Sequence, residues 1–444
     1  MIVMKFGGTS VGDGARIRRL AERVREREDR RPVVVVSALA GTTDRLETAL
    51  RCAASGRVEA VEPVLAELSR AHRWALRGAV DGSERRHDLT VAFDRDLDEL
   101  RELLRSVRVL GEWTARARDA VLAYGERGAA RLVEAALVEH GVPAQGFDPV
   151  EVLRTDDRHG AASPDLEATR RATRTLAEAS GEGRVPVVGG FVARGRDGAP
   201  TTLGRGGSDT TAAVLGCVLD AEEIQIWTDV DGILTADPRR CPGARRLPRV
   251  SFRFAAELAS HGAEVLHPGA LSPAVRRGIP ITVRNAFEPD DPGTRVESDP
   301  DPESDAIALA CREPVVAWRL LDRTLDASHA WAVRVAWASL SPAPFVILAS
   351  GYGAVLAFDR APDVVPDDVV DAGCTVETLD ERAWIGVVRE GRSRGPALDG
   401  ALERELQPDA WTSGASGGLG ILLPRERLNA ALGRLHAAWV PAGA

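Results

Sequence analysis

The sequence predicts an α/β sandwich built around a mostly parallel sheet, followed by two small α+β modules. In the first two-thirds of the 444 residues, short apolar runs alternate with amphipathic helical patterns. Prolines and aspartates then interrupt the chain at 289–293 and 298–302, a composition typical of a linker. Beyond this linker the strands are shorter and fall into two weakly similar halves. We therefore expect one large domain over 1–297 and a paired region over 303–444.

The N-terminal elements alternate between strand and helix. The first predicted strand covers residues 2–6 and ends at two consecutive glycines. Apolar residues then recur at helical spacing over 17–24, which predicts a surface helix with one buried face. Residues 33–36 are all valine, and such a short β-branched run favours a strand that is covered on both faces.

The middle of the chain continues this alternation. Residues 53–121 carry a Glu- and Arg-rich pattern that predicts an almost wholly helical segment. Three further apolar runs predict strands at 187–192, 224–227 and 279–283, and a helix of small residues is expected at 211–219. A mostly parallel sheet with helices on its faces accounts for this order of elements.

The C-terminal region has a different pattern. Residues 306–310 and 383–388 each open one half, and each half continues with a candidate helix and later apolar strands. The segment ILLPRERL at 421–428 is followed by a last helix. This layout predicts two small α+β modules.

The composition indicates an ordinary globular protein. The chain is 44% hydrophobic and 28% charged, and its net charge of −9 disfavours nucleic acid and acidic membranes as partners. Met1 leads directly into a predicted strand, and no apolar run approaches the roughly 20 residues that cross a bilayer. The five cysteines are scattered, which predicts reduced thiols rather than disulfides or a zinc site. We therefore expect a cytoplasmic protein with no dedicated metal site.

Lys5 is the only lysine of the chain, and every other permanently cationic side chain is an arginine. It lies in MKFGGTS at residues 4–10, directly before Gly7 and Gly8. An ammonium is a compact point charge, whereas a guanidinium is a flat fork, and the glycines place bare backbone beside it. The alternative is chance survival of one lysine, but the two glycines favour a phosphate-binding role.

The segment TTLGRGGSDTT at 201–211 has three glycines around Arg205. Such a loop lets backbone N–H groups face an anion, and the helix expected after it presents its N-terminus to the same ligand. Arg205 is suited to grip a carboxylate or a phosphate through two parallel hydrogen bonds. A plain surface turn is the alternative, but it does not require so many glycines next to Ser208 and Asp209.

Three weaker motifs accompany this loop. Thr228 and Asp229 directly follow a predicted strand, where they either meet a nucleotide or cap the strand end. Glu126 is a single carboxylate in a helical pattern and is uninformative alone. His261 and His267 do not have the spacing of a helical metal-ligand pair, so we expect structural roles for both.

Read together, these motifs resemble the aspartokinase branch of the amino acid kinase family. The resemblance covers about the first 295 residues, with the motifs in the family's order. The matching segments are residues 4–10, 37–43, 125–126, 154–156, 190–191, 202–209, 227–229 and 265–268. The C-terminal region has the length and rough layout of the family's paired ACT regulatory modules.

The resemblance implies transfer of the γ-phosphoryl group of ATP to the side-chain carboxylate of L-aspartate, giving 4-phospho-L-aspartate. This is the first step of the aspartate-family amino acid pathway or of a specialised branch. A carboxylate is already a nucleophile at neutral pH, so catalysis rests on alignment and charge neutralisation. Lys5 would hold the β- and γ-phosphates, Gly7 and Gly8 would admit them, and Mg²⁺ would be carried mainly by the ATP phosphates.

The resemblance also implies the remaining contacts. Arg205 would clamp the α-carboxylate of aspartate, and Glu126 would accept hydrogen bonds from its α-ammonium. Asp209 would orient Lys5 or the substrate. The substrate pocket would be completed by Ser37, Thr43 and Phe191. The nucleotide would be contacted by Thr228, Asp229, Asp237 and Arg239.

Some positions depart from the family pattern. Leu234 stands where many relatives carry a tyrosine, and Glu264 where many carry a lysine that reaches the phosphates. Either Arg239 compensates for that lysine or Glu264 turns away. The stretch 339–344 has two prolines and no acidic residue to hold an effector's ammonium. We therefore expect a protein that is insensitive to lysine and threonine. Paired modules of this kind bury their sheet edges against another copy, so we also expect a homodimer or a higher even oligomer.

Two other functions are compatible with these residues. One is a kinase of another acidic amino acid in a specialised pathway, which the departures at 234, 264 and in the C-terminal region motivate. The other is a non-catalytic subunit that binds an amino acid. Retention of Lys5, Glu126, Arg205 and Asp209 favours an enzyme.

Overall fold

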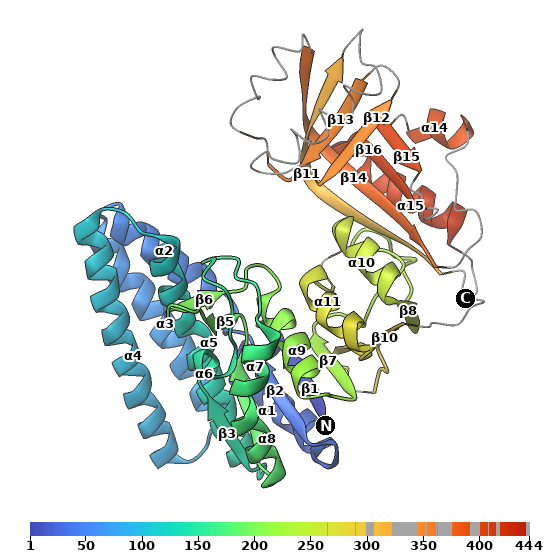
Figure 1. Ribbon diagram of the computed structural model, residues 1–444. Helices are drawn as coiled ribbons and strands as arrows, with labels where there is room; N and C mark the ends of the chain where they lie inside the picture. Colours follow the sequence, from blue (N-terminus) through green and yellow to red (C-terminus); the bar gives the residue numbers. More distant parts are fainter. Residues whose placement is uncertain are drawn as a thin grey trace. The chain divides into compact units, whose positions relative to one another are not determined.

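The computed structural model divides the chain into two units (Figure 1). The first unit comprises Met1–Ile233 and Val265–Ser298, and the second comprises Leu234–Glu264 and Asp299–Ala444. The residues that the structure describes are 1–263, 265–288, 290–298, 306–321, 345–350, 353–360, 362, 375–390, 400–406, 408–413 and 418–440.

A mostly parallel sheet forms the centre of the first unit, as the sequence predicts. Its strands lie in the order β3-β4-β2-β1-β7-β9-β10, and all neighbours are parallel except β9 and β10. The strands are β1 (Ile2–Phe6), β2 (Pro32–Val36), β3 (Ala144–Phe147), β4 (Val185–Gly189), β7 (Glu223–Thr228), β9 (Ile281–Asn285) and β10 (Thr294–Glu297). The valine run of β2 is wholly buried, which explains why it lacks polar alternation.

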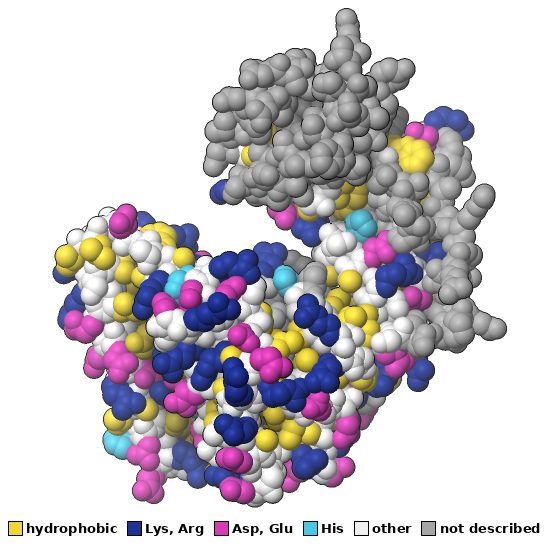
Figure 2. Space-filling model, viewed as in Figure 1, with side chains coloured by type: hydrophobic (Ala, Val, Ile, Leu, Met, Phe, Trp, Pro, Cys, Tyr) yellow, Lys and Arg dark blue, Asp and Glu magenta, His cyan; other side chains and the backbone are white. Residues whose placement is uncertain are grey.

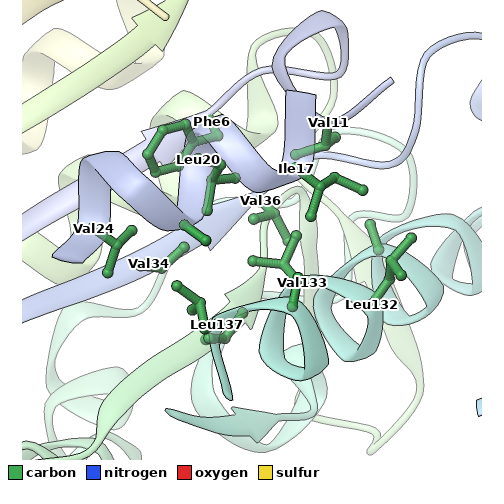
Figure 3. Packing of buried hydrophobic residues seen from close by; sticks show 14 of the residues in the cluster. Phe6, Val11, Ile17, Leu20, Val24, Val34, Val36, Leu132, Val133 and Leu137 are labelled. Carbon is green, nitrogen blue, oxygen red and sulfur yellow. The ribbon is translucent and has the colours of Figure 1, made fainter. Parts of the chain in front are cut away.

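The two faces of β1 contact different parts of the first unit. Ile2, Met4 and Phe6 belong to a buried cluster that includes apolar residues of α1 (Gly14–Arg25) and α5 (Ala115–Glu139), part of which Figure 3 shows. Side chains alternate along a strand, so Lys5 points to the opposite face. There it meets α9 (Gly207–Val218), which packs on β1 and β7.

The predicted helical segment 53–121 is confirmed. Its main helices are α3 (Val58–Ala79), α4 (Ser83–Leu110) and the start of α5, and α2 (Thr42–Ala54) precedes them. Leucines and valines from all four helices form one buried cluster. The remaining helical elements of this unit are η1 (Thr9–Val11), η2 (Glu28–Arg30), α6 (Pro149–Val152), α7 (Leu166–Ala172), α8 (Arg174–Gly181) and α11 (Pro268–Arg277).

One predicted strand is divided. The sequence predicts a continuous strand at 187–192, but β4 ends at Gly189 and β5 (Val192–Arg194) begins a separate two-stranded sheet with β6 (Pro200–Thr202). The break lies at Phe191, whose φ of 63° is left-handed. A residue in that conformation cannot continue a strand.

The second unit contains an antiparallel sheet with the strand order β12-β13-β11-β14-β16-β15. The strands β11 (Ile307–Leu321) and β14 (Thr375–Arg389) pair at its centre. Each has 15 residues, so the expectation of shorter strands in this region is wrong for these two. Each half contributes three neighbouring strands. The others are β12 (Val346–Ser350), β13 (Gly353–Phe358), β15 (Ala410–Ser413) and β16 (Leu419–Pro424). The predicted pair of α+β modules is thereby confirmed.

Other elements of the second unit are β8 (Arg249–Ser251), α10 (Phe252–Ser260), α14 (Gly400–Leu406), η3 (Arg425–Arg427) and α15 (Leu428–Trp439). Residues 234–264 group with this unit, although the sequence places them before the linker. Within the unit, the buried Glu390 carboxylate accepts hydrogen bonds from Ser251 N (2.7 Å) and Ser251 Oγ (2.6 Å). The proposed domain boundaries at 297 and 303 remain predictions.

Surface and membrane properties can be stated for the described residues. No helix among them combines the length and the apolar character that a membrane crossing requires. Figure 2 shows arginine side chains interspersed with acidic side chains over the visible face of the first unit. The four described cysteines, Cys52, Cys217, Cys241 and Cys311, are free thiols.

Candidate active site

Lys5 and Asp209 form an ion pair between the central strand and the start of α9. Lys5 Nζ lies 2.5 Å from Asp209 Oδ1, and the two side chains are only 11% and 14% exposed. Lys5 comes from the penultimate position of β1, and Asp209 from the first turn of α9. The pair therefore fixes an ammonium where the parallel strands end, which is where ligands of such sheets bind.

Gly7 and Gly8 turn tightly beside this ammonium. Gly7 N donates a hydrogen bond to Trp227 O at 3.1 Å, so the turn stays close to the end of β7. A Cβ added to Gly8 would lie 3.0 Å from Ala38 O, a separation too short for an ordinary contact. The backbone at Gly7 and Gly8 is therefore bare beside Lys5.

The glycine-rich turn before α9 also requires its glycines. Gly204 and Gly206 have φ values of +75° and +70°, and a Cβ on Gly206 would collide with His267. Gly206 is the N-cap of α9, so the first N–H groups of that helix follow the turn. Arg205 is exposed and makes no ion pair with any residue that the structure describes. Its guanidinium is available to an anionic ligand.

Glu126 is a buried carboxyl on α5. Its Oε1 accepts a weak hydrogen bond from Ala38 N at 3.4 Å, while Oε2 is buried without a hydrogen-bond partner among the described residues. Burial raises the pKa of Glu126 to about 8, although hydrogen bonds from its own backbone and from Ala38 oppose the shift. An unsatisfied buried carboxyl beside the end of β2 is suited to meet a cationic ligand.

Phe191 holds a strained conformation between β4 and α9. Phe191 N donates to Thr211 Oγ1 at 3.0 Å, and Phe191 O accepts from Leu203 N at 3.0 Å. A Cβ on Gly207 would lie 2.6 Å from the Phe191 ring, so the ring packs directly on the first residue of α9. Left-handed backbone at a bulky residue is uncommon and concentrates at functional sites.

Ser37 and Thr43 flank the Glu126 region. Ser37 directly follows β2, and its N–H donates to Phe6 O at 3.1 Å. Thr43 lies in the first turn of α2, and both side chains are half-buried. The segment from Ser37 to Thr43 also contains Ala38, whose N–H binds Glu126.

Thr228 and Asp229 lie at the end of β7. Trp227 is in register with Phe6, so Thr228, the last residue of β7, and Asp229 lie next to the turn at Gly7. Thr228 Oγ1 donates to Asp229 Oδ1 at 3.2 Å, and the Asp229 side chain is exposed. Both predictions, a nucleotide contact and a strand-end cap, remain compatible with this geometry.

Asp237 and Arg239 belong to the second unit. Arg239 Nε and Nη2 donate to the two oxygens of Asp237 at 3.0 and 2.9 Å. Burial opposes ionisation of Asp237, but the hydrogen bonds from Arg239 outweigh it and lower the pKa of that carboxyl. Leu234 is half-buried and forms a β-bridge with Arg246, whereas Glu264 and the stretch 339–344 lie outside the described residues.

Asp119 is a buried residue that the sequence reasoning missed. Its side chain on α5 is 0% exposed. Thr202 Oγ1 donates to Oδ1 at 2.6 Å, Gly160 N donates to Oδ2 at 2.9 Å, and His159 Nδ1 lies 3.0 Å from Oδ2. Asp119 thus ties the 159–160 loop to the end of β6, two residues before the glycine-rich turn.

The two histidines of segment 261–268 each accept a hydrogen bond within the structure, and their structural roles stay a prediction. Gly269 N donates to His267 Nδ1 at 3.2 Å, which caps α11, and burial lowers the pKa of His267. In the second unit, Trp384 Nε1 donates to His261 Nδ1 at 3.0 Å. Within the described part of the chain, no group of three or more His, Cys, Asp or Glu residues is arranged to hold a metal ion.

Comparison with known proteins matches residues 1–285 to the amino acid kinase family. The chain is 41% identical to chloroplastic aspartokinase 2 of Arabidopsis thaliana over 304 residues, which cover 66% of this chain and 53% of the relative. It is 38% identical to lysine-sensitive aspartokinase 3 of Escherichia coli K12, covering 67% of this chain and 64% of the relative. The chain spans about half the length of the Arabidopsis aspartokinases that it matches.

Solved structures extend the similarity to both units. E. coli aspartokinase III in complex with aspartate and ADP matches with a TM-score of 0.84 and 29% identity, over 98% of this chain and 99% of that chain. The same enzyme in complex with lysine and aspartate matches with a TM-score of 0.78. The predicted resemblance and the predicted fold class are thereby confirmed.

Proposed function

Because the chain belongs to the amino acid kinase family, we propose that it phosphorylates the side-chain carboxylate of L-aspartate with ATP, giving 4-phospho-L-aspartate. Similarity to aspartokinases along both units supports this assignment. The observation that carries it is the ion pair of Lys5 and Asp209 at the strand ends, adjoining the turn that bears Arg205, which has no ion-pair partner among the described residues. The reaction needs two cationic groups: a compact ammonium for the phosphate, which Lys5 supplies, and a forked guanidinium for the carboxylate, which Arg205 supplies.

At the phosphate end, Lys5 would neutralise the charge of the transferring phosphoryl group. Its ion pair with Asp209 keeps the ammonium in place before the nucleotide enters. The bare backbone of Gly7 and Gly8 would admit the phosphates, and Thr228 would contact the nucleotide from β7. A magnesium ion carried by these phosphates needs only one or two protein oxygens, and the exposed Asp229 carboxylate would supply one. When bound, the ion shields the phosphate charge.

At the substrate end, Arg205 would bind the α-carboxylate of aspartate through two parallel hydrogen bonds. The buried Oε2 of Glu126, which lacks a partner among the described residues, would receive the α-ammonium. Ser37, Thr43 and the strained Phe191 would complete the pocket. The free side-chain carboxylate is ionised at neutral pH and attacks without a general base, so the protein supplies alignment.

Assembly is the role that we propose for the second unit. Asp237 and Arg239 hold each other in a fixed geometry within this unit, and their contact with the nucleotide stays a prediction from the resemblance. The edge strands β12 and β15 of the C-terminal sheet would pair with another copy, because exposed sheet edges are commonly buried in this way. We infer a homodimer or a higher even oligomer.

A coupled assay of ADP release tests this function. L-aspartate, L-glutamate, D-aspartate and N-acetyl-L-aspartate are supplied in turn with ATP and magnesium. L-aspartate should give the highest kcat/KM, and N-acetyl-L-aspartate should fail because it lacks the ammonium that Glu126 receives. A higher kcat/KM for another acidic amino acid would establish the alternative substrate, which Leu234 and Glu264 motivate. ADP release with none of them would favour the non-catalytic alternative.

A further inference from the structure

A basic cleft lies among the helices of the first unit, between the second half of α3 and the first turns of α4. Its volume is about 320 Å³, which is at the lower end of small-molecule sites. Polar side chains dominate its lining: Arg73, Arg77, Ser83, Arg86, His87 and Thr90. α3 and α4 run side by side in Figure 1, and the cleft is formed within this one unit.

The charges of the cleft do not cancel. Arg73 is neutralised by Asp94, which it contacts at 2.6 and 2.8 Å. Glu84 lies in the first turn of α4 but is not among the residues that line the cleft, and Glu139 of α5 binds Arg85 at 2.7 Å. Arg77 and Arg86 make no ion pair with any residue in the described part of the chain. Two unneutralised guanidinium groups therefore share one concave surface.

A smaller inner pocket continues from this cleft. It has a volume of about 30 Å³ and shares Arg73, Leu76 and Thr90 with the outer cleft. His72 is also among its lining residues and is only 6% exposed. The ring stacks on Phe93, with 4.4 Å between the ring centroids.

The inner pocket presents an unsatisfied acceptor. His72 Nδ1 lies 3.0 Å from Leu68 O and therefore carries the proton, whereas Nε2 is buried without a partner among the described residues. Burial lowers the pKa of His72 to about 4, so the ring is neutral near pH 7. A buried acceptor without a donor is costly, and a ligand hydroxyl would satisfy it.

We propose that this cleft binds a small phosphomonoester, whose phosphate is held by Arg77 and Arg86 and whose hydroxyl group reaches His72 Nε2. A phosphate carries close to two negative charges and three acceptor oxygens, which match two guanidinium groups and the hydroxyls of Ser83 and Thr90. The site is formed by α3, α4 and α5 and is separate from the Lys5–Asp209 pair on the α9 face of the sheet.

Calorimetric titration of the full chain with glycerol 3-phosphate tests the phosphate half. We expect a Kd below about 1 mM, weakened at least about tenfold in the double variant Arg77→Glu/Arg86→Glu. The matched control is Arg70→Glu/Arg108→Glu, which reverses two exposed arginines of the same helices outside the cleft. Thermal unfolding checks that both variants fold. Absence of binding to the wild type, or equal weakening in both double variants, would overturn the proposal.

Two further titrations locate the ligand. Binding should persist in a Lys5→Ala variant, because the cleft does not involve the Lys5–Asp209 pair, and its loss there would assign the ligand to the candidate active site and overturn the proposal. His72→Phe keeps the aromatic stack but removes the acceptor. This variant should bind glycerol 3-phosphate more weakly than the wild type does, and its affinity for inorganic phosphate should be unchanged. Unchanged binding of glycerol 3-phosphate by this variant would overturn the hydroxyl contact.

Discussion

Lys5 is the residue on which the proposed phosphoryl transfer depends most directly. Lys5→Arg keeps the charge but places a broad planar fork where a compact ammonium fits between Asp209 and the glycine turn. We expect kcat to fall by about 100-fold, while the thermal unfolding midpoint stays near that of the wild type. The coupled ADP assay measures this loss. If the variant retained more than about a tenth of the wild-type kcat, this result would contradict the assignment of Lys5 to the phosphate site.

Arg205 is expected to act on aspartate rather than on the nucleotide. Arg205→Lys loses the bidentate fork, so KM for aspartate should rise at least about tenfold and KM for ATP far less. Steady-state kinetics with each substrate varied in turn separates the two effects. Arg196→Lys, at another exposed arginine of the same unit, is the matched control. A rise confined to KM for ATP would indicate that Arg205 binds the nucleotide instead of aspartate.

Glu126 predicts a pH dependence of aspartate binding. The pKa of Glu126 is raised from 4.5 to about 8 by burial, so the free protein holds this carboxyl protonated near neutrality. The ammonium of aspartate pairs only with the ionised Glu126 carboxylate. The affinity for aspartate should therefore increase between pH 6 and 8, by up to about tenfold per pH unit. Titrations in buffers of different ionisation enthalpy should detect proton release. Glu126→Gln should bind weakly at every pH, and pH-independent affinity in the wild type would contradict this role.

The same carboxyl affects the stability of the unliganded protein. Between pH 4.5 and about 8 the folded state keeps a proton that the unfolded chain releases. The free energy of unfolding therefore falls as the pH rises through this window. Saturating aspartate should reduce that dependence, because it pairs with the ionised carboxylate.

At the scale of elements, α5 is tied to two loops through Asp119. Asp119→Asn keeps the side-chain shape, but an amide nitrogen cannot accept hydrogen bonds from Gly160 N and His159. We expect KM for aspartate to rise severalfold with a lowered unfolding midpoint, because the loop before Arg205 loses its support. Asp98→Asn on the exposed face of α4 should change neither quantity. Normal kinetics with lowered stability would limit Asp119 to a structural role.

The elements themselves follow from the sequence to different degrees. The strand at Ile2–Phe6 and the position of Lys5 opposite the α1 face follow from apolar content and the two-residue period. The break at Phe191 does not, because an apolar run favours a strand and only contacts with Thr211 and Gly207 maintain the turn. Asp119 lies among arginines and has the sequence pattern of a solvated helix face, so its burial depends on tertiary contacts.

At the scale of the whole molecule, assembly and regulation are separable. The C-terminal sheet has two edge strands that pair with another copy in the proposed oligomer. The stretch 339–344 has no acidic residue for an effector's ammonium. A ligand changes activity only through differential affinity for two states. We therefore expect an even oligomer by light scattering and less than about twofold inhibition by millimolar lysine or threonine. A monomer would contradict the first expectation, and strong inhibition the second.

The single lysine has a consequence for chemical labelling. Apart from the amino group of Met1, which pairs with Glu222 at 2.7 Å, Lys5 Nζ is the only aliphatic amine in the chain. An amine-directed acylating reagent therefore has one internal target, and that target lies in the candidate active site. Intact mass spectrometry can then follow site occupancy directly, because a bound nucleotide that covers Lys5 removes one mass increment. Because Lys5 is the only lysine of this chain, any lysine acetylation or ubiquitination would modify Lys5 itself.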